Sequence, residues 1–466
     1  MKIKRLKITS FRRISDLTLL FDENQPTVLL GINGVGKSSI LDCLAILLSK
    51  LTGRIQESLD STRSLSEQDI MNGSEQTEIE ITVSLDEGRE FTWLVNKQKE
   101  GSKLAKSAGE MRLEAIKAIL VDIDDQRLQQ LNRSRDLTKA LSQVFAQIEA
   151  DDVSQDSVAS LETAVDYIKS QLDQNENASI PVVVYYPVNR AVLDLPLEIT
   201  ADYLVKQINA YDQALTGGRI DFKGFFEWFR NTEDLENELR RDNPGYRDKQ
   251  LSAVRRAIAS LQPDFSDLRV ARSPLQMTVK KQGQEFIVNQ LSDGEKCLLA
   301  MVGDLARRLA IANPGDLDPL QGSGVILIDE IELHLHPKWQ RQIIPALTRT
   351  FPNCQFIITT HSPQVVSHVK PDSLYLLQAT SNETVVQQPE SSFGRDSNSI
   401  LEDIMGVPER PPEIQNSLRD LFRLIEQGDI NRARQLRKDL ADEIGEDDPE
   451  FVRADVLIRR KEILNR

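Results

Sequence analysis

The residues best suited to chemistry lie in residues 31–38, where the spacing is G-x-x-x-x-G-K-S. An apolar run, 28–30, precedes this stretch and an apolar-periodic segment, 40–48, follows it, as in a strand, a tight turn and a helix. Glycine lets the backbone curl until several N–H groups point at one place beside the positive end of a helix. Lys37 adds a charge for the β- and γ-phosphates, and Ser38 adds an oxygen ligand for Mg²⁺. The motif predicts that a nucleoside triphosphate is bound by Asn33, Gly34, Gly36, Lys37, Ser38 and Ser39.

Two neighbouring carboxylates, Asp329 and Glu330, follow the apolar run 325–328. A buried strand can hold the first near the Mg²⁺ and let the second reach the attacking water. Phosphoryl transfer to water needs both roles. Strands often end in acids, so the pattern has this meaning only beside the glycine loop. We predict that Asp329 is a metal ligand together with Ser38, and that Glu330 is catalytic.

Two further patterns match the same chemistry. His361 ends the apolar stretch 356–360 and could hydrogen-bond a γ-phosphate or the attacking water, although a lone histidine at a strand end is usually structural. Residues Ser292, Gly294 and Glu295 open a helix and offer a hydroxyl, a glycine N–H and a helix dipole to an anion. An ordinary helix cap is the alternative for that segment. We predict a catalytic role for the histidine and nucleotide contacts for the other three.

Composition limits the class of protein. The chain has 466 residues, which is enough for two or three domains, and its three scattered cysteines predict a cytoplasmic protein. No apolar run is long enough to span a bilayer, so no membrane contact is expected. The net charge of −15 argues against a general nucleic-acid coat, but residues 1–15 are locally basic, which leaves DNA contact open. Arg12 and Arg13, in the turn after the first apolar stretch, join the predicted nucleotide contacts.

Periodicity predicts the elements around these motifs. Residues 3–8 alternate as in an edge strand, and residues 79–85 and 90–95 alternate around a turn, which predicts a hairpin. Helical patterns dominate from about residue 102. Among them, the aromatic cluster 222–229 is expected to pack inside a helical subdomain, with base stacking as the alternative.

The same patterns divide the chain. Residues 1–390 are expected to form a head that is interrupted by a mainly helical insertion at about 102–262, and residues 391–466 a helical C-terminal region. In that region one helix face is predicted over 430–444, and Asp448-Pro449 predicts a further helix start.

Taken in order, 31–38, 291–295, 329–330, 334–337 and His361 resemble the motif set of ABC-type ATPase heads, in the branch of SMC, RecF and overcoming-lysogenization proteins. The resemblance implies an α/β fold with helical insertions and a helical C-terminal tail, and ATP as the nucleotide. It also implies a homodimer or higher homo-oligomer, in which the 291–295 segment of one subunit closes the nucleotide held by the other. The segment 185–190 occupies roughly the position of the family's glutamine-loop, but it contains no glutamine and the loop itself is not assigned.

Residues 394–401 and 405–411, with the helical tail, are similar to the PtuA family, the ATPases of Septu anti-phage systems and of some retrons. This resemblance implies an HNH nuclease of the PtuB type as the working partner. A nucleic acid, either phage DNA or retron msDNA with its reverse transcriptase, is a further partner that it allows.

A His-x-His pair, His334 and His336, is expected to lie in a subunit-contact loop, because no third ligand for a metal stands nearby.

Three other functions are alternatives to this one. A RecF-like DNA-binding repair protein is the main alternative. A self-contained overcoming-lysogenization nuclease would need an acidic metal-binding domain, yet residues 362–466 have helical patterns, and Asp122 and Asp124 form an isolated acidic pair. A transporter motor fits least, because Ser38 and Leu291 are too far apart in sequence for such motors.

Overall fold

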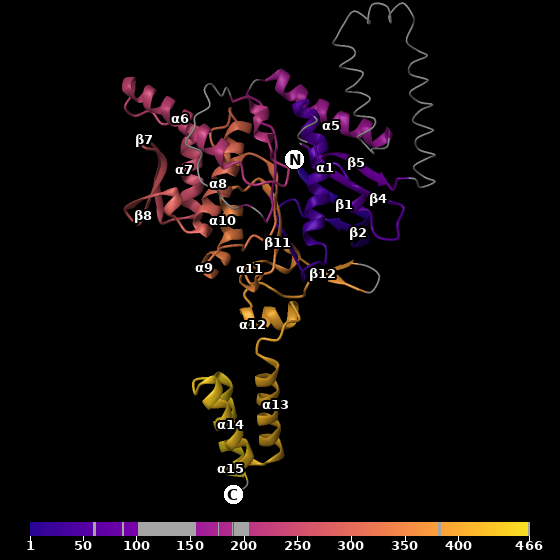
Figure 1. Ribbon diagram of the computed structural model, residues 1–466, viewed down its shortest axis with the longest axis vertical. Helices are drawn as coiled ribbons and strands as arrows, with labels where there is room; N and C mark the ends of the chain where they lie inside the picture. Colours follow the sequence, from indigo (N-terminus) through magenta and orange to yellow (C-terminus); the bar gives the residue numbers. More distant parts are fainter. Residues whose placement is uncertain are drawn as a thin grey trace, which may run out of the picture. The chain divides into compact units, whose positions relative to one another are not determined.

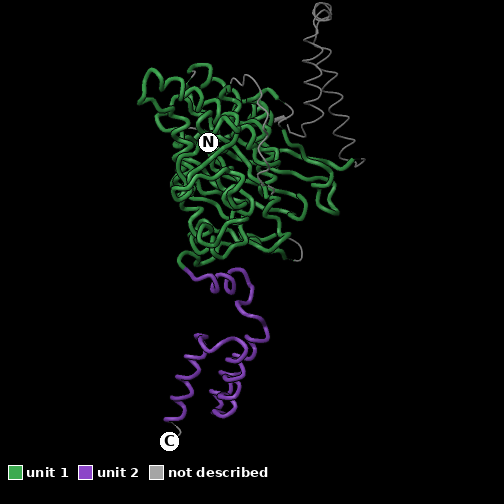
Figure 2. The backbone as a smooth tube through the Cα atoms, turned by 60° about the vertical axis from the view of Figure 1, so that its left-hand side comes forward, with its two compact units in different colours: residues 1–394 green, residues 395–466 purple. Residues whose placement is uncertain are grey.

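The computed structural model describes residues 1–58, 62–85, 88–100, 155–175, 177–188, 190, 205–380 and 384–464. It divides into two compact units, Met1–Gly394 and Arg395–Arg466 (Figure 2). Much of the predicted helical insertion, including Asp122 and Asp124, lies outside the described residues. Helices and strands both contribute to the first unit and helices build the second, so the predicted α/β class with a helical C-terminal region is confirmed.

A six-stranded sheet forms the centre of the first unit (Figure 1). Its strands, in spatial order, are β13 (Thr384–Gln387), β12 (Leu374–Ala379), β3 (Thr27–Leu30), β11 (Cys354–Thr360), β10 (Gly324–Ile328) and β6 (Val182–Tyr186). All neighbours are parallel except β13, which pairs antiparallel with β12. Every residue of β3, β6, β10 and β11 is buried, as expected for parallel strands that are covered on both faces.

The register of this sheet brings the predicted motifs to one edge. Leu30 at the end of β3 lies opposite Thr360 at the end of β11, and Ile328 at the end of β10 lies opposite Ile358. The loops that follow these three strands therefore leave the sheet side by side. Residues more than 300 positions apart in the sequence become neighbours in this way.

A second, antiparallel sheet has the order β2 (Ile14–Leu20), β1 (Lys2–Phe11), β4 (Gln76–Leu85) and β5 (Arg89–Gln98). The predicted hairpin is confirmed as β4 and β5. The prediction of an edge strand over residues 3–8 is wrong, because β4 pairs with β1 on the side away from β2. Helix α1 (Lys37–Gln56) contacts strands of both sheets and is almost wholly buried between them.

The remaining elements of the first unit cover the sheets. Helix α5 (Gln155–Gln174) packs on β5 and α1, whereas α8 (Asp293–Ala312) contacts β6 and packs against α6 (Phe222–Asp242) and α7 (Lys249–Leu261). A small sheet of β7 (Phe265–Arg272), β8 (Leu275–Lys281) and β9 (Gln284–Ile287) adjoins α6 and α7. Three short helices, α9 (Pro337–Gln340), α10 (Ile343–Thr350) and α11 (Pro363–Val366), follow β10 and β11. The aromatic cluster of α6 is buried, which confirms the packing interpretation; its members are Phe222, Phe225, Phe226, Trp228 and Phe229.

The second unit has its own core. It begins with α12 (Ser397–Ser399) and a π-helical turn, Ile400–Ile404, and continues with α13 (Pro412–Gln427), α14 (Ile430–Ile444) and α15 (Pro449–Leu464). The predicted apolar face of α14 packs into that core, and the predicted helix start at Pro449 is confirmed. Among the described residues of both units, no helix has the length and apolarity to cross a bilayer.

Candidate nucleotide-binding site

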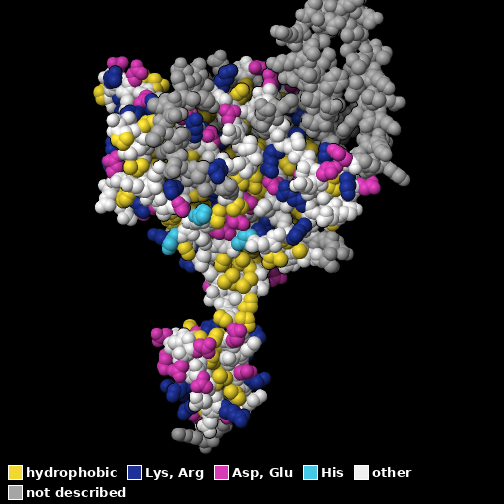
Figure 3. Space-filling view, viewed as in Figure 1, with side chains coloured by type: hydrophobic (Ala, Val, Ile, Leu, Met, Phe, Trp, Pro, Cys, Tyr) yellow, Lys and Arg dark blue, Asp and Glu magenta, His cyan; other side chains and the backbone are white. Residues whose placement is uncertain are grey.

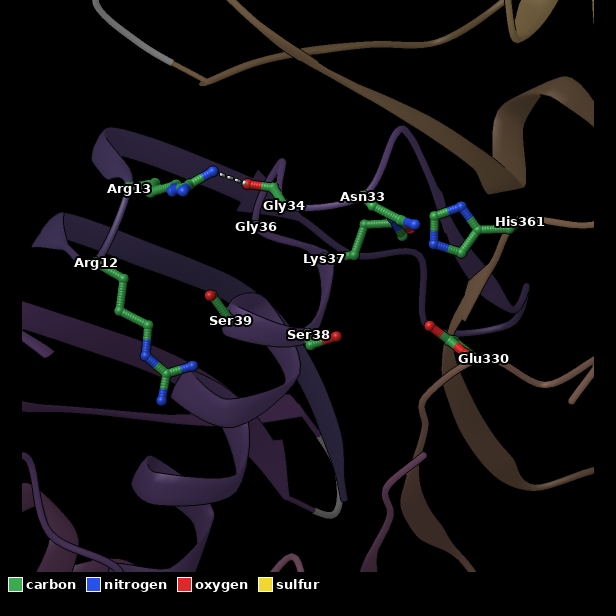
Figure 4. A pocket seen from close by; sticks show the side chains of 10 residues that line it. All are labelled: Arg12, Arg13, Asn33, Gly34, Gly36, Lys37, Ser38, Ser39, Glu330 and His361. Carbon is green, nitrogen blue, oxygen red and sulfur yellow. Dashed lines mark hydrogen bonds between the residues drawn. The ribbon is translucent and has the colours of Figure 1, made fainter. Parts of the chain in front are cut away.

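One pocket of about 450 Å³ brings together most of the predicted site residues (Figure 4). They come from the turn between β1 and β2, the loop after β3, and the ends of β10 and β11. The lining residues are Arg12, Arg13, Asn33, Gly34, Gly36, Lys37, Ser38, Ser39, Glu330 and His361. Asp329 lies next to this lining and is only 3% exposed.

The loop after β3 has the backbone geometry that the glycine spacing predicts. Gly34 and Gly36 have φ values of 79° and 112°, a left-handed region that other residues rarely adopt. The Lys37 ammonium donates hydrogen bonds to the carbonyls of Gly31, at 2.7 Å, and Ile32, at 3.0 Å, so it lies across the loop. Helix α1 starts at Lys37 without a side-chain cap, which leaves its first N–H groups available to an anion.

Electrostatics at Lys37 favour an anionic ligand. Burial lowers the pKa of Lys37, while the carboxylates of Asp329, Glu330 and Glu332 oppose that shift. A buried ammonium has lost the water molecules that would accept its hydrogen bonds, and phosphate oxygens could accept them instead. Ser38 is exposed and its hydroxyl is drawn toward the pocket in Figure 4.

The acidic pair is held by hydrogen bonds from two sides. Thr359 on β11 donates its hydroxyl to Asp329 Oδ1, and the Glu330 N–H donates to Thr359 Oγ1 at 2.8 Å. Arg190, which follows β6, donates to the carbonyls of both Asp329 and Glu330. The Glu330 backbone has a φ of 46°, an uncommon value for a residue with a side chain. These contacts stabilise that conformation and present the Glu330 carboxylate to the pocket.

Arg190 is a residue of the site that was not predicted from the sequence. Its side chain is 2% exposed, and its own carbonyl accepts a weak bond from the Cys297 thiol in the first turns of α8. The sequence does contain a signal for it: an arginine shortly after a buried apolar strand is expected to be buried too, and then it needs hydrogen-bond acceptors inside the protein. The partners themselves could not be inferred, because they depend on β6 lying beside β10.

His361 lies at the end of β11, across the pocket from the helix start. Figure 4 shows its imidazole next to Asn33 and Lys37, with Glu330 on the same side. Burial and the charge of Lys37 lower the pKa of His361, while nearby carboxylates oppose the shift. The ring is therefore favoured in its neutral form, which can donate one hydrogen bond and accept another.

The two predicted arginines behave differently. Arg12 forms ion pairs with Asp42 at 2.7 Å and Asp69 at 2.9 Å, and its side chain extends away from the glycine loop in Figure 4. Arg13 is exposed and reaches the carbonyl of Gly34 at 3.5 Å. Arg13 is thus better placed than Arg12 to meet a ligand, although both line the pocket.

The segment Ser292–Glu295 does not line this pocket. Ser292 caps α8 through a capping box with Glu295, whose carboxylate also pairs with Lys281 at 2.6 Å. A Cβ on Gly294 would lie 2.2 Å from the His334 carbonyl, so glycine is required for this close approach. Within one chain these three predicted nucleotide contacts therefore lie apart from the other predicted residues.

The residues present fit a magnesium ion. Mg²⁺ accepts few protein oxygens and completes its shell with water and phosphate. Ser38, which is exposed, and Asp329, whose Oδ1 accepts from Thr359, stay the predicted oxygen donors. Among the described residues, no group of three or more His, Cys, Asp or Glu side chains is arranged to hold a metal by itself. His336 instead caps α9, where its Nδ1 accepts from the Lys338 N–H at 3.3 Å.

Replacing Arg190 by methionine tests the support of the acidic pair. The variant leaves the buried Asp329 carbonyl and the partly buried Glu330 carbonyl without their donors, so we expect a loss of about 2 kcal/mol in the free energy of unfolding. We also expect kcat for ATP hydrolysis to fall by about tenfold, because Glu330 can leave its left-handed conformation. Urea unfolding and steady-state ATPase assays measure the two effects. An unchanged kcat would show that Arg190 does not support Glu330.

Comparisons with known proteins agree with this geometry. Residues 1–184 match the family model "AAA ATPase domain", and residues 201–367 match "AAA domain, putative AbiEii toxin, Type IV TA system". The "Retron Ec83 probable ATPase" of Escherichia coli is 27% identical over 99% of this chain and 87% of its own length. The "Retron Vc95 probable ATPase" of Vibrio cholerae is 27% identical over 94% and 86%. "Septu protein PtuA" of Bacillus thuringiensis is 27% identical over 42% of this chain and 51% of its own length.

Among solved structures, the SMC head domain from Thermotoga maritima covers 84% of this chain and 100% of its own, at 14% identity and a TM-score of 0.42. The predicted resemblance to the retron and PtuA ATPases is confirmed by the named relatives. Together with the glycine loop and the acidic pair, these matches identify the chain as an ATPase that is similar to the retron ATPases and to Septu PtuA.

Proposed function

We propose that two copies of this chain close around two ATP molecules, and that this closure controls an HNH nuclease partner in anti-phage defence. Each ATP would sit in the pocket of one copy, beneath residues 291–295 of the other. One observation carries the proposal: the pocket holds the glycine loop, Glu330 and His361 of a chain but not its Ser292–Glu295 segment. We place the complex in the cytoplasm, in keeping with three buried, free cysteines.

Within a closed pocket, each residue has a chemical task. The loop N–H groups and Lys37 would bind the phosphates, and Ser38 and Asp329 would hold Mg²⁺, which supplies charge neutralisation at the phosphates when bound. Glu330 would orient and deprotonate the attacking water, and His361 would hydrogen-bond that water or the γ-phosphate.

Exposed groups at the pocket and at the α8 start suit a second copy. Ile32, in the glycine loop, is 63% exposed, which is unusual for a large apolar side chain beside a binding site. Ser292 and Asp293 are exposed as well, although Gly294 and Glu295 behind them are buried. A partner chain could cover Ile32 and present its own helix start to the phosphates.

Mixing two inactive variants tests whether the site is shared. Lys37→Ala removes the cation that would bind the phosphates. Ser292→Asp can still accept from the first N–H groups of α8, but it places a negative charge toward the neighbouring phosphate and beside the Glu295 carboxylate. We expect each variant alone to be inactive. A 1:1 mixture, combined before ATP is added, should recover about a quarter of the wild-type rate, because half of the dimers then hold one intact site of two.

Two outcomes of the mixing experiment are decisive. Recovered ATPase activity requires that the glycine loop and the helix start of one site come from different chains. If the two variants exchange subunits and the mixture stays inactive, the proposal is overturned. Ser292→Asn is the matched control, since asparagine also caps a helix but carries no charge. If it is as inactive as Ser292→Asp, the charge argument fails.

The nuclease part of the proposal rests on the resemblance of residues 394–401 and 405–411 to the PtuA family, and the positions of the basic residues bear on the choice between a protein and a DNA partner. In the N-terminal basic stretch, Lys4 pairs with Glu23, Arg5 with Glu80, and Arg12 with Asp42 and Asp69. On the face in Figure 3, the described Lys and Arg side chains are interspersed with Asp and Glu rather than gathered in one basic surface. These pairings favour a protein partner over RecF-like DNA binding. Co-purification with an HNH protein encoded beside this chain, with and without ATP, tests it.

A further inference from the structure

Glu332 receives two hydrogen bonds from the end of β11. Its Oε2 accepts from the Thr360 hydroxyl at 2.8 Å, and its Oε1 accepts from the His361 N–H. Glu332 is partly buried, whereas Thr360 has no exposed surface. Both carboxylate oxygens are thus engaged by the turn that carries His361.

The loop after β10 binds the end of β11 residue by residue. Asp329 accepts from the Thr359 hydroxyl, the Ile331 N–H donates to the Thr359 carbonyl at 3.1 Å, and Glu332 binds the next two residues. This arrangement joins the backbone of Glu330 to that of His361 through hydrogen bonds rather than through packing alone. Glu332 is the part of the connection that reaches His361 directly.

We propose that Glu332 is a positioning residue for ATP hydrolysis, which fixes the turn at His361 so that the imidazole and the Glu330 carboxylate face the same point in the pocket. The inference rests on the proposed catalytic role of His361. Glu332 itself does not line the pocket, so it would contact neither the nucleotide nor the metal and would act only through His361.

The chemistry of the contacts explains why a carboxylate is needed. A hydroxyl and an N–H both donate to Glu332, and an ionised carboxylate can accept at both oxygens. Glutamine of the same length can accept at only one atom and would direct its NH₂ group at the other donor. Glu332→Gln should therefore release either Thr360 or the His361 N–H, and small displacements of a catalytic group lower turnover strongly.

A double-mutant cycle between Glu332→Gln and His361→Ala tests the proposal. Steady-state kinetics would give kcat and KM for the wild type, both single variants and the double variant, with ATP affinity measured by calorimetry. We expect Glu332→Gln to lower kcat about tenfold or more and to change the ATP dissociation constant less than about threefold. In the His361→Ala background the same substitution should change kcat less than about twofold, because Glu332 then has nothing left to position.

Controls separate positioning from loss of folding. Glu285→Gln removes an exposed ion pair with Arg269 on the small sheet and should leave kcat unchanged. Thr360→Val keeps the side-chain shape but removes one of the two donors, so it should also lower kcat. It serves as the second test of the proposal if Glu332→Gln folds poorly. Thermal unfolding followed by circular dichroism reports folding of every variant.

Three results would overturn the proposal: independent, multiplicative losses in the double variant, a wild-type kcat for His361→Ala, or a loss of ATP affinity that accounts for the whole effect of Glu332→Gln. Each variant is measured alone and without subunit mixing. A failed cycle would therefore leave the mixing experiment unaffected, and a failed mixing experiment would leave the cycle interpretable.

Discussion

Alanine at position 37 is expected to remove measurable ATP binding. The Lys37 ammonium is the cation that the fold holds across the glycine loop, through the Gly31 and Ile32 carbonyls. A charge-assisted hydrogen bond contributes about 1.5–3 kcal/mol, and Lys37 can reach two phosphates. The dissociation constant for ATP should rise by about 100-fold or more. Isothermal titration calorimetry with ATP and Mg²⁺ measures it directly.

The fold should survive this substitution. Lys37 is buried, and alanine removes its charge together with the cost of burying it. The two loop carbonyls that it binds are in partly buried hydrogen bonds, so water can take the place of the ammonium. Lys438→Ala, on an exposed position of α14, is the matched control and should bind ATP as the wild type does. Unchanged ATP affinity in Lys37→Ala would mean that the pocket is not the nucleotide site.

The part of this site that could be predicted is the part encoded locally. The left-handed values at Gly34 and Gly36 and the helix start at Lys37 follow from eight consecutive residues, so no knowledge of the tertiary fold is required. The acidic pair and His361 were also identified locally, since each ends an apolar run. Their meeting in one pocket depends on parallel strands ending at the same edge of the sheet.

The part that could not be predicted depends on which strands are neighbours. Arg190 reaches the acidic pair only because β6 pairs with β10, and Glu332 reaches His361 only because β10 pairs with β11. Neither pairing is written in a local pattern. The same limit explains why β1 was wrongly predicted to be an edge strand. Its alternation predicts one buried face, but it does not show whether one strand or two pair with it.

Ser292 and Glu295 illustrate a different limit. The capping alternative and the phosphate-binding alternative use the same serine, glutamate and helix start, so the sequence pattern alone does not separate them. The structure shows the capping box within one chain. A phosphate contact from a second chain stays a proposal, and the mixing experiment decides it.

Glutamine at position 330 is expected to stop hydrolysis while ATP still binds. The backbone around Glu330 is held by Thr359 and Arg190, and neither contact involves the carboxylate that the substitution removes. The side chain keeps its size, so the pocket should keep its shape. Because general-base catalysis contributes about 100-fold or more, kcat should fall by at least that factor with little change in ATP affinity.

With hydrolysis blocked, ATP should hold the two copies of Glu330→Gln together, because the nucleotide would lie in the interface and stabilise the closed form by mass action. Light scattering after size-exclusion chromatography should show a dimer at saturating ATP and a smaller species without it. Adding Lys37→Ala to the same chain should abolish the ATP-dependent dimer, which links dimer formation to the pocket rather than to a surface effect of glutamine. A Glu330→Gln protein that binds ATP yet stays monomeric would rule out closure around shared nucleotide, whatever the fall in kcat.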